Sequence, residues 1–180
     1  MTEPSDKELK ALILNALRHD PDSIGILLDS EGYVTREDFL GCANLSSEYV
    51  IRPGQLDAIL SKDGGALFEV RGTTFRAITG HTTDQFDYPP AQPDEPLYYL
   101  VSQKDYDAHI EEWGLEPVRT RYIPLERTAP GALATQGKRR IKKAHVLLEI
   151  SKDSPNLFLF CNRWYCTEVP PAYITRRCEV

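Results

Sequence analysis

The chain has 180 residues, of which 41% are hydrophobic and 27% charged, so it is long enough to bury a core as one large domain or two small lobes. Its net charge of −6 at pH 7 argues against a nonspecific binder of polyanions, because such affinity comes from many lysine and arginine side chains. No apolar run reaches the length of a membrane span and the first residues are polar, so we expect a cytoplasmic protein with no membrane partner.

The cysteines are too few for a disulfide framework in a chain of this length. None belongs to a CxxC pair, and the spacing of Cys161 and Cys166 encloses a segment that is typical of a strand. Small buried thiols are therefore the favoured interpretation, and no metal site is predicted.

The first predicted helix covers Glu8 to Leu17, where the apolar residues recur at helical spacing. Asp20-Pro21 ends it, which leaves Arg18 and His19 at its C-terminal end. The partial negative charge of a helix C-terminus favours cations, so capping of the helix is one interpretation of both residues.

Two further helices and a hairpin follow in the first half of the chain. Thr35 and Asp38 have the spacing of a helix cap, and another helix is expected after Pro53. Residues 67–70 and 74–78 flank a turn, as in a β-hairpin. Helices followed by a hairpin predict a winged-helix lobe over residues 1–84.

Residues 85–96 are rich in proline and are expected to form a stiff linker between two lobes. In residues 97–180 we expect strands at 97–101, 122–125, 145–150, 157–161 and 164–167, and a helix from Ser102 to near Gly114. Trp113 and Trp164 are expected to pack in the core. The fold class is therefore predicted to be α+β.

Five basic residues distant in sequence suggest phosphoryl chemistry if they converge: Arg18, His19, Arg76, His81 and Arg139. Arginine offers a planar pair of donors to a phosphate dianion, and histidine can pass a proton near neutral pH. Arg139 lies in the basic run Lys138–Lys143, for which a solvated loop is the alternative. We found neither a phosphate-binding glycine-rich loop with Lys-Ser or Lys-Thr nor clustered carboxylates for magnesium, so a metal-free reaction is favoured.

An ordered set of short motifs runs along nearly the whole chain. In chain order it consists of Leu17-Arg18-His19-Asp20-Pro21, Ile24-Gly25, Leu28-Asp29, Gly32-Tyr33-Val34, Phe75-Arg76-Ala77, Gly80-His81-Thr82, Gly114-Leu115, Gly137-Lys138-Arg139, Asn162 with Trp164, and Val169-Pro170-Pro171. In this order the motifs resemble the RNA 2'-phosphotransferases, also called KptA or tRNA splicing 2'-phosphotransferases.

The resemblance implies a winged-helix RNA-binding lobe followed by an ADP-ribosyltransferase-like lobe of strands and short helices, over residues 97–180, that binds NAD as a co-substrate. It also implies a reaction in two steps. The 2'-phosphate of RNA displaces nicotinamide from NAD, giving an ADP-ribosylated RNA phosphate. A ribose hydroxyl then attacks that phosphate, which releases ADP-ribose 1'',2''-cyclic phosphate and RNA with a free 2'-hydroxyl. The expected partners are 2'-phosphorylated RNA and NAD, and the expected state is a monomer.

The resemblance also assigns roles to individual residues. Arg18, His19, Arg76 and Arg139 match the catalytic set of the family, in which the arginines would hold the phosphate and His19 would act as an acid. Substrate contacts are expected from His81, Lys138 and Arg140. Cofactor contacts are expected from Tyr98, Tyr99, Gly114 and Leu125.

The motifs expected to face NAD differ from the family pattern. The family's Leu-Tyr-His-Gly-Thr is replaced by Leu97-Tyr98-Tyr99-Leu100-Val101, and its Val-His-Leu-Ser strand is replaced by Ile123-Pro124-Leu125-Glu126. Both histidines are therefore replaced. The Tyr99 hydroxyl can supply a hydrogen bond, whereas the Pro124 side chain can supply none.

Three other functions remain open from the sequence. The replacements at Tyr99 and Pro124 favour a catalytically weak homologue that binds 2'-phosphorylated RNA or another phosphoester. An ADP-ribosyltransferase with a different acceptor would need a positioning acid, for which Glu126 is the candidate. A winged-helix transcription regulator fits poorly, because the helix that would enter the groove carries no arginine between Gln55 and Leu60.

Overall fold

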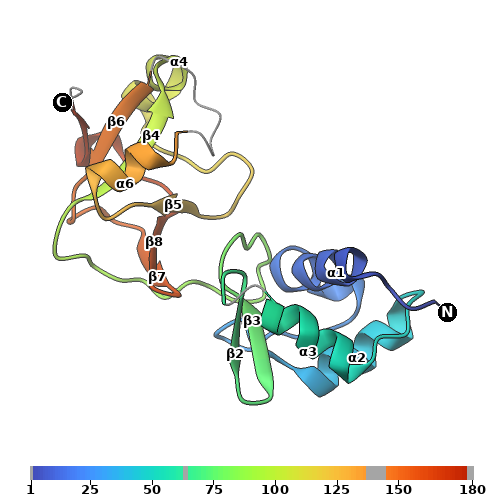
Figure 1. Ribbon diagram of the computed structural model, residues 1–180. Helices are drawn as coiled ribbons and strands as arrows, with labels where there is room; N and C mark the ends of the chain where they lie inside the picture. The colour runs from blue at the N-terminus through green and yellow to red at the C-terminus, as the bar shows by residue number, and fades with distance from the viewer. Residues whose placement is uncertain (1, 63–64, 137–144, 178–180) are drawn as a thin grey trace. The chain divides into compact units, whose positions relative to one another are not determined.

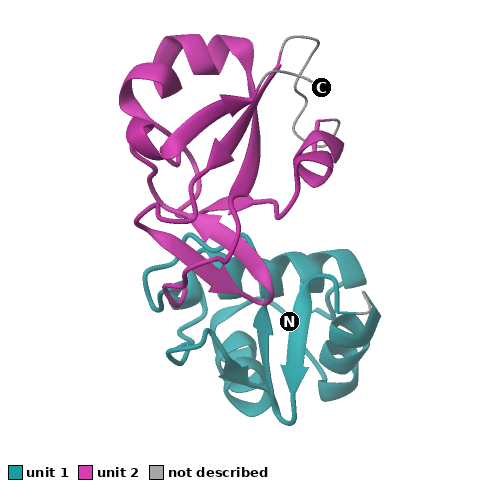
Figure 2. Ribbon diagram, turned by 90° about the vertical axis from the view of Figure 1, so that its left-hand side faces the viewer, with its two compact units in different colours: residues 1–87 teal, residues 88–180 magenta. Residues whose placement is uncertain are grey.

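The computed structural model describes residues 2–62, 65–136 and 145–177. The chain divides into two compact units, residues 1–87 (unit 1) and residues 88–180 (unit 2), which are coloured teal and magenta in Figure 2. No helix in the described ranges combines the length and the apolar character needed to cross a membrane.

Unit 1 contains three helices and a small sheet. A capping box starts the first helix, since the Ser5 side chain accepts from the Glu8 amide and the Glu8 carboxylate accepts from the Ser5 amide. Thr35 caps the second helix by accepting from the Asp38 amide at 3.0 Å. The elements are α1 (Asp6–Arg18), η1 (Pro21–Ser23), β1 (Val34–Thr35), α2 (Arg36–Ser46), α3 (Pro53–Lys62), β2 (Phe68–Arg71) and β3 (Thr74–Ala77).

The sheet of unit 1 is antiparallel, with strand order β1-β3-β2. Gly72, with φ of 59°, lies in the turn that joins β2 to β3. The register of this hairpin pairs Glu69 with Arg76. The core is formed by apolar residues from every helix and from the hairpin, and in it the rings of Phe39 and Phe75 meet edge to face at 5.4 Å. The hairpin is thereby fixed against the helices, and Arg76 with it.

Unit 2 is built on two three-stranded antiparallel sheets, ordered β4-β6-β9 and β5-β8-β7 (Figure 1). Its elements are β4 (Leu97–Ser102), α4 (Gln103–Asp105), the π-helical turn η2 (Tyr106–Ile110), α5 (Glu111–Trp113), β5 (Ile123–Leu125), α6 (Ala129–Ala134), β6 (His145–Ile150), β7 (Leu157–Phe160), β8 (Arg163–Cys166), η3 (Pro171–Tyr173) and β9 (Ile174–Arg177).

One apolar core joins the two sheets of unit 2. Val101 and Leu148 enter it from the first sheet, and Leu125, Trp164 and Cys166 enter it from the second. Burial raises the pKa of the Cys166 thiol to about 12, so this thiol is a packing group. Alternate residues of β4 and β6 point to the other face, where helix α6 packs.

The proline-rich segment is held to unit 2 by aromatic stacking. The Tyr88 ring lies between those of Tyr122, at a centroid distance of 4.0 Å, and Phe160, at 4.2 Å, and is nearly parallel to both. Just after it, the amide of Ala91 donates to the Leu157 carbonyl at 3.0 Å. The segment therefore extends the edge of β7.

The structure confirms the α+β class and the helices expected at 8–17, after Thr35 and after Pro53. It also confirms the 67–78 hairpin and the expected strands of the second half to within a residue or two. The helix expected from Ser102 consists of α4, η2 and α5 in succession. Trp164 packs in the core as expected, but the prediction for Trp113 is wrong, because this side chain is 62% exposed. Strands β1 and β9 and helix α6 were not predicted.

Gly114 ends α5 with φ of 90°, and a Cβ atom there would lie 2.2 Å from the Val169 carbonyl oxygen. We predict that Gly114→Ala destabilises the protein by roughly 2 to 4 kcal/mol, because it combines backbone strain with overpacking. The measurement is urea unfolding followed by circular dichroism. Gly41→Ala is the control, since a Cβ on Gly41 of α2 would meet nothing within 4 Å. Equal unfolding midpoints for Gly114→Ala and the parent protein would contradict this account.

Candidate functional site

The end of α1 is joined to the segment that follows β3 (Figure 1). The Arg18 carbonyl oxygen accepts hydrogen bonds from the amides of Thr82, at 2.7 Å, and Thr83, at 3.0 Å. The last carbonyls of a helix have no partner within the helix, so these two amides satisfy one of them. Gly80, with φ of 81°, gives the segment the turn that this contact requires. Two motifs distant in sequence are thereby brought together.

The Arg18 side chain is half-buried and lies along Gly80. A Cβ on Gly80 would be 3.6 Å from Cδ, Nε and Cζ of Arg18. A side chain at position 80 would therefore lie in van der Waals contact with the guanidinium end of Arg18.

His19 is the C-cap of α1 and is exposed. Its Nδ1 lies 2.8 Å from Oγ1 of Thr82, within hydrogen-bond distance. The same threonine thus contacts the helix end through its amide and the imidazole through its hydroxyl.

Arg76 lies on β3 and is only 8% exposed. Its Nε and Nη2 donate to Oε2 of Glu69 at 2.9 and 2.6 Å, and its Nη1 donates to the Glu31 carbonyl at 2.7 Å. The guanidinium also stacks over the Tyr33 ring, 4.3 Å from its centroid. Arg76 is therefore a rigidly oriented cation whose charge is largely balanced by Glu69.

His81 is 2% exposed and packs edge to face on Phe86. Burial lowers its pKa to about 3, and the positive charges of Arg18, His19 and Arg76 act in the same direction. His81 is therefore neutral at physiological pH. The hydrogen bonds of Thr82 and Thr83 to the end of α1 bring His81 next to Arg18 and His19, and Arg76 is near enough for its charge to act on the same ring.

The other predicted residues of the phosphate site, Lys138, Arg139 and Arg140, lie outside the described residues. In the described ranges, no three His, Cys, Asp or Glu side chains come together in a way that would hold a metal ion.

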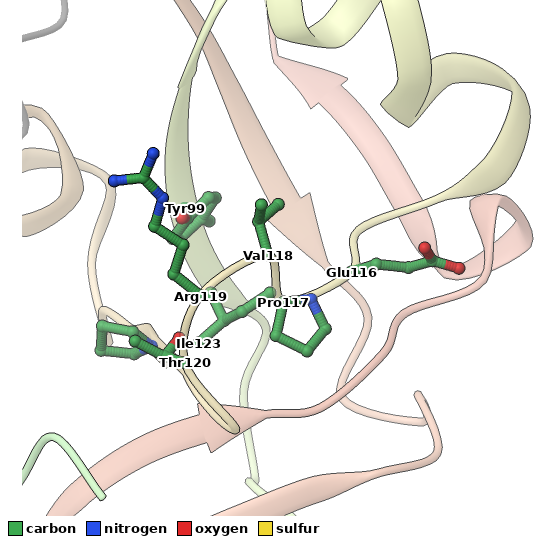
Figure 3. A pocket seen from close by; sticks show the side chains of 8 residues that line it. Tyr99, Glu116, Pro117, Val118, Arg119, Thr120 and Ile123 are labelled. Carbon is green, nitrogen blue, oxygen red and sulfur yellow. The ribbon is translucent and has the colours of Figure 1, made fainter. Parts of the chain in front are cut away.

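Unit 2 contains a cavity of about 300 Å³, shown in Figure 3. The lining residues with polar side chains are Tyr99, Glu116, Arg119 and Thr120, and the Glu116 carboxylate points away from the rest of the lining (Figure 3). The remaining lining residues are Pro117, Val118, Ile123 and Pro124.

The cavity includes one of the four residues expected to contact the cofactor, Tyr99. Tyr98, its neighbour on β4, lies on the opposite face of the strand and donates its hydroxyl to Glu149 at 3.3 Å. Burial, with the Glu149 charge, raises the Tyr98 pKa. Leu125 is buried in the core and Gly114 packs on the Val169 carbonyl, so cofactor contact by these three residues stays a prediction.

Comparison with known proteins gives a consistent result. Residues 5–159 match the model of the family described as RNA 2'-phosphotransferase, Tpt1 / KptA family. The chain belongs to this family. A protein of Methanosarcina barkeri named probable RNA 2'-phosphotransferase is 30% identical over 69% of this chain and 59% of its own length. Proteins of the same name from Agrobacterium fabrum and Pectobacterium carotovorum are 29% and 25% identical, over 88% and 97% of this chain and 88% and 96% of their own lengths.

Membership of the RNA 2'-phosphotransferase family confirms the resemblance drawn from the ordered motifs. The structure adds four residues to which sequence reasoning assigned no role: Glu69, Thr82, Arg119 and Thr120. Glu69 had a signal in the sequence, because counting back from the hairpin turn pairs it with Arg76. The contact of Thr82 with His19 spans 63 residues and has no local signal.

We predict that unit 1 loses stability as the pH falls from the ordinary histidine pKa of 6.5 towards about 3. In this window the unfolded chain binds a proton at position 81 and the folded chain does not, so acid favours unfolding, by at most about 1.4 kcal/mol per pH unit. Amide hydrogen exchange of α1, corrected for intrinsic rates, measures this slope. His81→Asn should show a smaller slope, and equal slopes in the two proteins would refute the assignment.

Proposed function

We propose that the chain removes an internal 2'-phosphate from RNA by transferring it to NAD, with unit 1 holding the phosphate and unit 2 holding NAD. The observation that supports this most is the closure of residues 80–83 onto the end of α1, which brings His81 next to Arg18 and His19. The charge of Arg76 acts on the same His81 ring. In this proposal unit 1 is a winged-helix RNA-binding lobe, consistent with its helices and hairpin. Unit 2 is an ADP-ribosyltransferase-like lobe, consistent with its two antiparallel sheets and short helices.

In unit 1 the arginines bind the phosphate dianion. A guanidinium offers two parallel donors to phosphate oxygens and stays charged at every relevant pH. Arg76 is held in place by Glu69 and the Glu31 carbonyl before any ligand binds, so little side-chain entropy is lost on binding. Arg139 is assigned to phosphate binding by its place in the family motif, as are Lys138 and Arg140, its neighbours in the sequence.

His19 is the proton donor of the proposed reaction. The RNA 2'-oxygen leaves phosphorus as an anion and needs a proton, which a positioned imidazolium can deliver. His19 suits this role because it is exposed at the helix end, whereas His81 is buried and neutral. The products are RNA with a 2'-hydroxyl, nicotinamide and ADP-ribose 1'',2''-cyclic phosphate.

The cavity of unit 2 fits one nucleotide half of NAD. Its volume of about 300 Å³ lies at the small end of the range for ligand pockets, and its donors suit a sugar and a pyrophosphate. Tyr99 and Thr120 would bind ribose or amide groups and Arg119 a phosphate. When bound, NAD supplies the ribose carbon that accepts the RNA phosphate. Pro124, also in the lining, supplies no hydrogen-bond donor from its side chain.

The test is incubation with a 2'-phosphorylated oligonucleotide, with and without NAD, while phosphate loss from the RNA is followed. We expect turnover only with NAD. Arg18→Ala and Arg76→Ala should each lower kcat by about 100-fold or more, because each removes a donor that stabilises charge in the transition state. Arg52→Ala is the control, since Arg52 pairs with Glu3 at the surface of unit 1. Tight oligonucleotide binding without turnover would instead show a binding protein.

The NAD site has a separate test. Tyr99→Phe removes one hydroxyl from the cavity lining and should weaken NAD binding by roughly 2- to 12-fold, the equivalent of one net hydrogen bond. Titration calorimetry in the absence of RNA measures this affinity. Tyr106→Phe is the matched control, because Tyr106 packs on the same core outside the cavity. An unchanged dissociation constant for Tyr99→Phe would exclude Tyr99 from the site.

A further inference from the structure

Backbone hydrogen bonds hold both residues of the His19–Thr82 contact in place. His19 is the C-cap of α1, and its amide donates to the Asn15 carbonyl at 2.9 Å. The Thr82 amide donates to the Arg18 carbonyl, so the two residues are fixed to the same helix end. The Thr82 side chain is β-branched and therefore has few χ1 rotamers. The 2.8 Å contact thus joins two groups whose backbones are already in place.

We propose that Thr82 is a positioning residue whose Oγ1 accepts a hydrogen bond from Nδ1–H of His19. Nε2 is then the atom that delivers a proton to the departing RNA oxygen. This inference rests on the proposed function and deepens it. It assigns the two nitrogens of one ring to separate tasks, one structural and one chemical.

The proton transfer that follows from this arrangement is balanced. The O–P bond to the RNA 2'-oxygen breaks and its electron pair stays on that oxygen. The Nε2–H bond of the imidazolium breaks, its electron pair stays on Nε2, and the proton forms the new O–H bond of RNA. Nδ1 keeps its proton throughout and donates a hydrogen bond to Oγ1 of Thr82. The neutral ring is left as the Nδ1–H tautomer, with Nε2 ready to take up the next proton.

An exposed imidazole needs such a partner more than a buried one does. His19 is exposed, so the packing that fixes a core side chain does not fix its ring. Rotation by half a turn about χ2 would put the carbon Cδ2 in the place of Nδ1 and the carbon Cε1 in the place of Nε2. A hydrogen bond to a hydroxyl held by the backbone favours one of the two orientations.

Thr83, the residue after Thr82, makes a different side-chain contact. Thr83 is buried, and its Oγ1 accepts from the Gln85 amide at 3.3 Å within the same turn. Its amide also donates to the Arg18 carbonyl. Thr83 therefore stabilises the turn, while the Thr82 hydroxyl contacts the imidazole.

The experiment compares Thr82→Val and Thr82→Ser in the full chain labelled with ¹⁵N-histidine. The ring ¹⁵N shifts of His19, assigned with His19→Gln, report which nitrogen of the neutral ring carries the proton. We expect the Nδ1–H tautomer in the parent protein and in Thr82→Ser, and a shift towards Nε2–H in Thr82→Val. We also expect kcat to fall by roughly 10- to 100-fold in Thr82→Val, within the contribution of general acid catalysis, with KM for the oligonucleotide nearly unchanged. Thr82→Ser should restore kcat.

Thr73→Val, in the exposed hairpin turn, is the control for loss of a threonine hydroxyl from unit 1 and should keep the parent kcat. Identical His19 shifts in the parent protein and Thr82→Val would overturn the proposal, as would a rise in KM with kcat unchanged. If no phosphorylated oligonucleotide is turned over by the parent protein, the proposed function fails. The ring shifts, which need no substrate, still decide whether Thr82 sets the tautomer.

Discussion

The carbonyl oxygen of Arg18 accepts two backbone hydrogen bonds, and the site of unit 1 depends on them. They close the segment after β3 onto the end of α1, which places Gly80 along the Arg18 side chain and Thr82 against the His19 ring. His81 is buried by the same closure, beside three positive charges that disfavour its protonation. The amides of Thr82 and Thr83 thus supply the hydrogen bonds that this carbonyl at the helix end would otherwise take from water.

The elements of unit 1 were largely predictable because their signals are local. Helical spacing of apolar residues identified α1, the Thr35 cap identified α2, and the glycine-containing turn identified the hairpin. The ordered motifs selected Arg18, His19, Arg76 and His81, and the structure brings these four together. The role of Thr82 was not predictable, because it arises from tertiary closure and not from the spacing of nearby residues. Glu69, the partner of Arg76, could have been predicted from the register of the hairpin.

Unit 2 was harder to predict for physical reasons that can be named. Helix α6 is short and contains Pro130 and Gly131, both poor formers of a helix interior, so its only sequence signal is the Thr128 cap followed by proline in the first turn. Strand β9 is short and largely polar, because as an edge strand it exposes most of its side chains. In the candidate NAD site, alternation along β4 separates Tyr98 from Tyr99, so adjacent motif residues meet different surroundings. Motif matching treats such neighbours alike.

The pairing of Arg76 with Glu69 bears on how RNA is discriminated. Every nucleotide of RNA carries a monoanionic phosphodiester, and an uncompensated buried arginine would attract all of them. With the Glu69 carboxylate already on its Nε and Nη2, Arg76 has little net attraction for a single negative charge. A 2'-phosphate monoester carries nearly twice that charge, so Arg76 attracts it more strongly while Glu69 keeps the guanidinium oriented. In the proposed function the ion pair therefore weakens binding of the phosphodiesters of the RNA backbone, while a 2'-phosphate still binds. Once that phosphate is gone, the RNA carries only monoanionic diesters at this site, so its attraction to Arg76 is weak and the RNA is released.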